Sequence, residues 1–92
     1  MRNPLVRIKE LIPNLPGKDS QLANKFLENR DFKSILEIVE SDIYKANKAK
    51  YIQQEEVPND YISLLTELKS ELLIYISYIE IPNNSKDYND YY

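Results

Sequence analysis

The sequence predicts an all-α protein, an antiparallel hairpin of two long helices preceded by two short N-terminal helices, with flexible ends. Apolar residues recur at alternating steps of three and four along residues 32–46 and again along residues 61–79. This spacing places them on one stripe of a helix, which is typical of a helix packed against another helix. Proline residues mark the expected helix ends, and the single glycine, Gly17, lies in an expected turn.

The first expected element is a short helix over residues 4–11. Asn3 suits the position that caps a helix, and Pro4 suits its first turn. Apolar residues follow at steps of three and four: Leu5, Ile8 and Ile12. Pro13 is expected to end this helix, and the segment NLPGKD at residues 14–19 is expected to form a turn.

A second short helix is expected from Asp19 or Ser20 to about Asn29. Its apolar stripe consists of Leu22, Ala23, Phe26 and Leu27. After a tight junction, Asp31 is expected to cap a third and longer helix that fades after Lys48. The stripe of this third helix is Phe32, Leu36, Val39, Ile43 and Ala46, and it is broadened by Ile35 and Ile38.

The last expected helix is the longest, running from Asn59 or Asp60 to Ile81, where Pro82 is expected to end it. Its stripe is Tyr61, Leu65, Leu68, Leu72, Tyr75 and Ile79. Because its stripe matches that of the third helix and a polar link joins the two, we expect an antiparallel hairpin. Residues 73–81 are rich in β-branched and aromatic side chains and could form a strand, but no second strand-like run exists to pair with them.

The chain of 92 residues suits one domain, expected at residues 1–81, with residues 1–18 as an N-terminal arm. Residues 82–92 are expected to form a polar, tyrosine-bearing tail that is mobile in isolation. The arm carries four basic residues and one acidic residue, a net charge of +3, whereas the whole chain has a net charge of −3. A basic arm on an acidic body suits docking onto an acidic surface or a neighbouring copy; an ordinary solvated arm is the alternative.

The sequence predicts a protein that is not an enzyme and that has no cofactor or metal. Without His and Cys, it lacks the usual general base, most nucleophilic dyads and the ligands of structural zinc sites. A single Gly excludes a Gly-rich phosphate loop. Two pairs of glutamates share helical faces, Glu37 with Glu40 and Glu67 with Glu71, but they lie away from the apolar stripes and are expected to be solvated.

Binding to nucleic acid or to a membrane is disfavoured. Lys45, Lys48 and Lys50 alternate with Tyr44 and Tyr51 in a pattern that can bind nucleic acid. Complementation of the helix dipole and nearby acidic residues explain the cluster more simply. The helix–junction–helix at 20–48 resembles a helix-turn-helix motif but lacks its usual turn Gly. No segment approaches the ~20 apolar residues of a membrane span. Where the protein is not part of a larger assembly, we therefore expect it in the cytoplasm.

The apolar surface of the last helix widens after Leu72, and this is the strongest indication of function. A helix that is apolar on most sides needs cover on most sides, more than the rest of a short chain supplies. We therefore expect contact with a larger protein; self-association is a second possibility. The expected contact residues are Leu73, Ile74, Ile76, Tyr78 and Ile81 of the helix, Arg2 and Arg7 of the arm, and Tyr88, Tyr91 and Tyr92 of the tail.

The run FLENRDFKSILEIVESDIYK at residues 26–45, after NPLVRIKELIPNLPGKD at residues 3–19, resembles small helical proteins of tailed phages, the crAss-like group above all. The resemblance covers about the first half of the chain and rests on structural features: the Leu15-Pro16 turn, Asp19 and the junction at 29–32. It implies a virion structural or auxiliary protein bound to capsid or neck proteins, and it assigns no functional residue. A small cytosolic regulator or inhibitor of another protein is the alternative, and a nucleic-acid-binding module the third.

Overall fold

The structure, a computed structural model, describes the backbone of residues 3–90 and the side chains of residues 3–79. Its helices follow one another along the chain as α1 (Pro4–Leu11), η1 (Ile12–Asn14), α2 (Lys18–Glu28), α3 (Phe32–Asn47), η2 (Lys48–Ile52) and α4 (Asn59–Asp90). No strand occurs in this described part, so the all-α prediction is confirmed there. Residues 73–81, for which a strand was the alternative, belong to α4.

The first helix begins as its sequence dictates. The side chain of Asn3 accepts a hydrogen bond from the backbone N–H of Leu5 at 2.9 Å, and Pro4 occupies the first turn. Pro13 lies within the 3-10 turn η1. Gly17 precedes α2 with a φ of 60°, in the left-handed region where a side chain would be strained.

Between α2 and α3 the chain reverses through a hydrogen-bonded junction. Arg30 has a φ of 57°, and the N–H of Asp31 reaches the carbonyl of Phe26 at 2.8 Å, which closes the end of α2. Asp31 then caps α3, as the sequence predicts. Its carboxylate accepts hydrogen bonds from the N–H of Ser34 at 3.2 Å and from the Ser34 hydroxyl at 2.7 Å.

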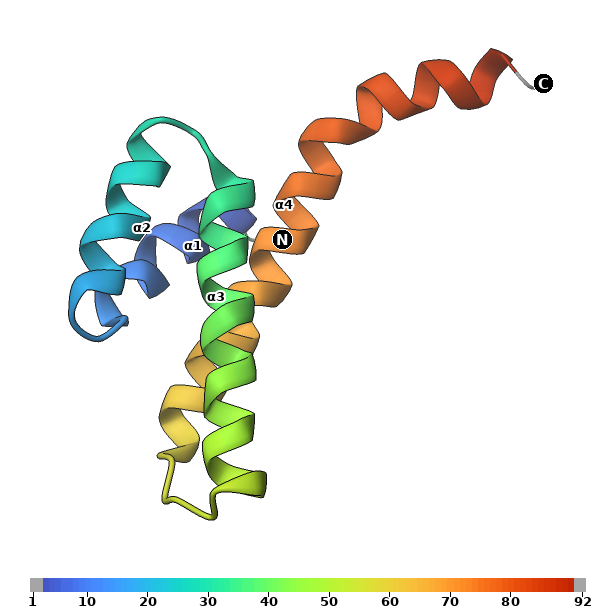
Figure 1. Cartoon of the computed structure of the whole chain (residues 1–92). Helices are drawn as coiled ribbons and strands as arrows, with labels where there is room; N and C mark the ends of the chain where they lie inside the picture. The colour runs from blue at the N-terminus through green and yellow to red at the C-terminus, as the bar shows by residue number, and fades with distance from the viewer. Residues whose placement is uncertain (1–2, 91–92) are drawn as a thin grey trace.

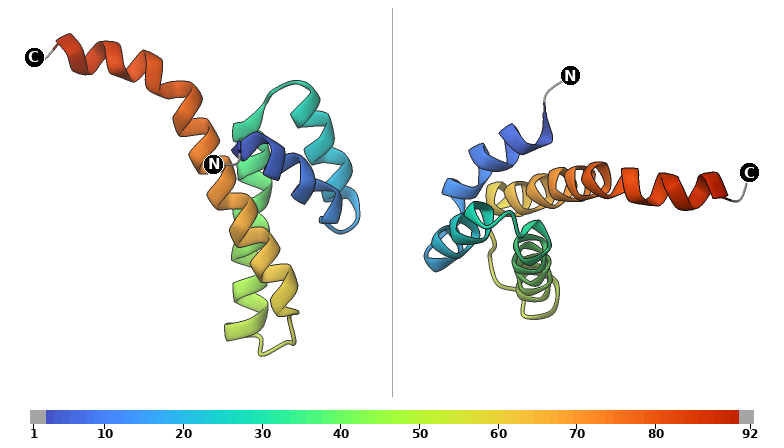
Figure 2. Two further views of the ribbon diagram at one scale, coloured as in Figure 1. Left: turned by 180° about the vertical axis from the view of Figure 1, so that it is seen from behind. Right: turned by 90° about the horizontal axis from the view of Figure 1, so that it is seen from above.

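The two longest helices, α3 and α4, lie side by side and run in opposite directions (Figure 1). Helix α1 packs against α4, and α2 packs against α3 and η1 (Figure 2). The buried apolar core therefore draws on all four α-helices and on the turn after α1. Its members are Ile8, Leu11, Ile12, Leu15, Ala23, Phe32, Ile35, Val39, Ala46, Leu65, Leu68 and Leu72.

The predicted stripe of the last helix is buried only along part of its length. Leu65, Leu68 and Leu72 are fully buried, and Tyr61 and Tyr75 are partly buried beside them. Ile79, expected to continue the stripe, is 45% exposed. The burial of the stripe thus ends after Tyr75.

The predicted end of the last helix at Ile81 is wrong, because α4 continues to Asp90. Pro82 has no N–H to donate, which removes one helical hydrogen bond and bends a helix without necessarily ending it. The sequence from residue 83 to residue 90 has no Gly to end the helix. Figure 1 shows α4 bending in its orange-red part and then continuing away from the other helices. No helix within the described residues is sufficiently long and apolar to cross a membrane.

Candidate functional site

An exposed apolar surface lies on α4 beside the end of the core. Leu73, Ile74, Tyr78 and Ile79, here called the α4 patch, are 45%, 50%, 71% and 45% exposed. The first three of these residues and Ser77 line a shallow hollow of about 440 Å³. Residues at positions i, i+1, i+4 and i+5 share one side of a helix, so this hollow follows a single helical stripe.

The α4 patch is exposed for two reasons: Leu73 and Ile74 lie on a side of α4 different from that of the buried Leu72, and Tyr78 and Ile79 lie beyond the start of α3. Phe32 is the first residue of α3, and its ring contacts that of Tyr75 edge to face, with centroids 4.8 Å apart and an interplanar angle of 64°. Since α3 and α4 run in opposite directions, residues of α4 beyond Tyr75 extend past the beginning of α3 (Figure 1). Tyr78 and Ile79 therefore have no counterpart in α3 to cover them.

Of the expected contact residues, Ile76 is the one on α4 that the structure packs partly against the core. Ile81 and Tyr88 lie on α4, but their side chains fall outside the described part of the chain. Arg2, Tyr91 and Tyr92 also lie outside the described residues. Of the expected contact residues, the structure therefore brings Leu73, Ile74 and Tyr78 together in the α4 patch, which also includes Ile79, a residue of the predicted stripe.

Arg7 belongs to α1, and its side chain, which is 32% exposed, extends to α4. Its Nε and Nη2 donate to the two carboxylate oxygens of Glu67, at 2.5 Å and 2.9 Å, and Nη1 lies 3.6 Å from Glu10. The hydrogen bond to Glu67 is the main reason why the pKa of Arg7 is raised. Arg7, expected from the sequence to contact a partner, thus makes contacts within its own chain.

A second group of residues was not singled out from the sequence. Asp42 of α3 has a partly buried side chain, and burial, followed by its proximity to Asp19 of α2, raises its pKa to about 7. Burial, together with the charges of the same two carboxyl groups, raises the pKa of Tyr61. The sequence does hold a signal: Asp42 follows Val39 by three and precedes Ala46 by four, which places an acid on the inner face of α3.

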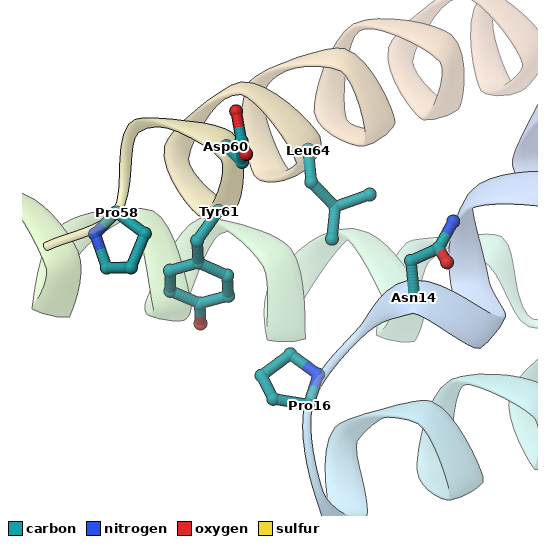
Figure 3. A pocket seen from close by; sticks show the side chains of 6 residues that line it. All are labelled: Asn14, Pro16, Pro58, Asp60, Tyr61 and Leu64. Atoms are coloured by element: carbon teal, nitrogen blue, oxygen red, sulfur yellow. The ribbon is translucent and has the colours of Figure 1, made fainter.

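A hollow of about 600 Å³ lies where the turn after η1 approaches the start of α4 (Figure 3). Its lining residues are Asn14, Pro16, Pro58, Asp60, Tyr61 and Leu64. Among them, Asp60 is the one carboxylate, and there is no Ser, Thr, Lys or Arg beside it. This hollow has the shape of a binding groove but lacks a pair of groups for acid–base or nucleophilic chemistry.

The basic and aromatic cluster, which spans the end of α3 and η2, is largely exposed to solvent. Tyr44, Tyr51 and Ile52 are 68%, 70% and 73% exposed. The ammonium of Lys50 lies 5.4 Å from the ring centroid of Tyr51 and donates to the side chain of Asn59 at 3.4 Å. The cluster is therefore accessible, but one of its three lysines is already engaged within the chain.

Among the described residues, no group of three or more His, Cys, Asp or Glu side chains is arranged to hold a metal ion. The candidate binding sites in this part of the chain are three surfaces: the α4 patch, the hollow lined by Tyr61, and the exposed residues at the end of α3 and in η2.

Comparison of the chain with protein-family models, curated proteins and solved structures finds no match.

Proposed function

We propose that the protein is a non-enzymatic accessory structural protein of a phage particle, which docks onto a larger capsid or neck protein through the α4 patch. The observation that carries the proposal is that the apolar stripe of α4 is fully buried at Leu65, Leu68 and Leu72, whereas the apolar residues of the α4 patch are exposed. In this proposal, the antiparallel hairpin of α3 and α4, with the two short helices beside it, is the scaffold that presents the patch. The resemblance to small tailed-phage proteins supplies the class of partner.

Binding would be driven by removal of apolar area from water, which contributes roughly 25 cal/mol for each Å² buried. Tyr78 is of a residue type that is enriched among those that dominate binding energy in protein interfaces, and the aliphatic side chains of the patch add apolar area. The proposed contact also includes Arg2, Ile81, Tyr88, Tyr91 and Tyr92, as expected from the sequence. Arg7 contributes indirectly, because it fixes α1 on α4.

The test is to change the patch without changing the core. Ile74→Asp and Tyr78→Asp place a charge where the proposed partner packs, and both positions are exposed, so the helical content and Tm should change little. Ser70→Asp is the matched control, because Ser70 is an exposed residue of α4 outside the patch. Incorporation of tagged variants into particles, measured by mass spectrometry, should fall for the first two and not for the third. Folded patch variants that enter particles normally would contradict the proposal.

A small cytosolic regulator that binds another protein is the second proposed function, because the same patch serves either class of partner. The two are separated by the composition of purified particles, in which a structural protein should be abundant and a regulator missing. Nucleic-acid binding is the third proposal, and it rests on the exposure of Tyr44 and Tyr51 beside lysines. A nucleic-acid complex should lose affinity steeply as salt is raised, whereas an apolar docking contact should not.

A further inference from the structure

Asp19 and Asp42, here called the carboxyl pair, face each other across the contact between α2 and α3. Asp19 lies in the first turn of α2, and Asp42 lies in the third turn of α3. The Oδ2 atom of Asp42 is inaccessible to solvent and receives no hydrogen bond from any described N–H or O–H group. Two carboxyl groups can hydrogen bond to each other only when one of them holds a proton.

The charges around the pair do little to compensate for its ionisation. Three charged or titratable groups face Asp42: Asp19 of α2, Lys45 of α3 and Tyr61 of α4. Tyr61 is a neutral phenol near neutral pH. Lys45 favours the ionised form of Asp42, but the effects of burial and of Asp19 are larger, and the pKa of Asp42 rises to about 7. Glu37 lines the same hollow as the pair, and η1 has no titratable side chain.

The buried face of α2 is small, so a change at the pair can affect how α2 packs: Phe26 and Leu27 are only partly buried against the core. Ala23 is the one residue of α2 that is fully buried. Both ends of the helix adjoin residues with positive φ, Gly17 before it and Arg30 after it, where the chain turns sharply. A hollow of about 440 Å³, open to solvent, already runs between α2 and α3.

We propose that the carboxyl pair is a proton-dependent latch, which holds α2 against α3 while one proton is shared and loosens it once both groups are ionised. In the closed form the shared proton joins two acids across the contact. When that proton leaves to solvent, two negative charges with no donor at Oδ2 face each other in a partly buried place. Like charges so placed repel, and the repulsion acts against a contact in which Ala23 is fully buried and Phe26 and Leu27 are partly buried.

The direction of the pH dependence follows from where Asp42 titrates. In the closed form its pKa is about 7, whereas in a released or unfolded chain it should return to its usual value of 3.8. The closed form therefore binds more protons throughout the interval between these values. Closure of α2 onto α3 is most favourable below pH 3.8. Its equilibrium constant falls by up to about tenfold for each pH unit above this value and reaches its minimum above about pH 7.

The chain is well suited to the experiment because it contains no His, the side chain whose ordinary pKa of about 6.5 lies near the upper end of this interval. Hydrogen exchange of the backbone amides of residues 22–28 would report release of α2. Their protection factors should fall between about pH 5 and about pH 7, and they should be lower than those of α4 residues 65–72. Equal protection of the two helices at every pH would mean that α2 does not open separately, and the latch would be wrong.

Two variants and one measurement on the unmodified chain complete the test. Asp42→Asn keeps the shape but cannot ionise, so the protection of α2 should become independent of pH over this interval. Glu37→Gln, which removes a carboxylate of the same hollow outside the pair, should keep the dependence of the unmodified chain. Should Asp42→Asn fail to fold, NMR of side-chain carboxyl carbons in the unmodified chain decides: one aspartate must titrate near pH 7. Titration of every aspartate below about pH 5 would overturn the proposal.

Discussion

Arg7 and Glu67, sixty positions apart in the sequence, meet through two parallel hydrogen bonds that join α1 to α4. Nε donates to Oε2 at 2.5 Å and Nη2 donates to Oε1 at 2.9 Å. A guanidinium and a carboxylate paired in this way fix both the distance and the relative rotation of the groups. The contact therefore sets how α1 lies across the helix that carries the α4 patch.

Replacement of Arg7 should loosen this contact. Arg7→Ala should lower the Tm, and Arg7→Lys should restore only part of the loss, because an ammonium cannot make the paired contact. In a double-mutant cycle with Glu67→Gln, the double variant should lose less than the sum of the single losses. Strict additivity in thermal unfolding would show that the two side chains do not interact in solution.

The core of α4 should be far more sensitive to truncation than its patch. Leu68 is fully buried, and Leu68→Ala should lower the free energy of unfolding by about 2–5 kcal/mol. Leu73→Ala removes the same atoms from a side chain that is 45% exposed and should change stability by about 0.5 kcal/mol or less. Urea denaturation followed by circular dichroism measures both. Similar losses at the two positions would place the buried stripe elsewhere on α4.

The cap of α3 should be worth about 1 kcal/mol. Asp31→Ala removes both acceptor contacts to Ser34 and should lower the free energy of unfolding by that amount. Asp31→Asn retains an acceptor oxygen at the cap and should lose much less. Equilibrium denaturation of the two variants side by side provides the comparison, and equal losses would mean that the charge of Asp31 matters rather than its capping geometry.

The contact between Phe32 and Tyr75 should contribute beyond the burial of the two rings. In a double-mutant cycle with Phe32→Leu and Tyr75→Leu, the coupling free energy should be about 0.5–1.5 kcal/mol. Tyr75→Phe keeps the ring and should preserve the coupling. A coupling close to zero would mean that the edge-to-face arrangement contributes no more than ordinary apolar contact.

Local patterns in the sequence predict well which segments are helical and which side of α4 is buried, because both depend on residues three or four positions apart. Leu65, Leu68 and Leu72 are the fully buried part of the predicted stripe. Asp31 was identified as a cap from its position before an apolar run. These features need no knowledge of the other helices.

Features that depend on how far a neighbouring helix extends could not be read from spacing. Ile79 continues the stripe in sequence but is 45% exposed, because α3 begins at Phe32 and Phe32 already contacts Tyr75. The sequence predicts that α4 ends at Ile81 because Pro82 cannot donate a helical hydrogen bond, but α4 bends and continues to Asp90. The carboxyl pair was missed because Asp19 and Asp42 meet only once α2 packs on α3.

Leu72 and Leu73 are adjacent in the chain, yet the first is fully buried and the second is 45% exposed. Each residue of an α-helix turns by about 100°. One inserted residue after Leu72 would therefore rotate the α4 patch by that angle relative to the core, while seven would return it to nearly the same orientation about 10 Å farther out. Variation in the length of α4 among related chains should consequently occur in steps that preserve this orientation.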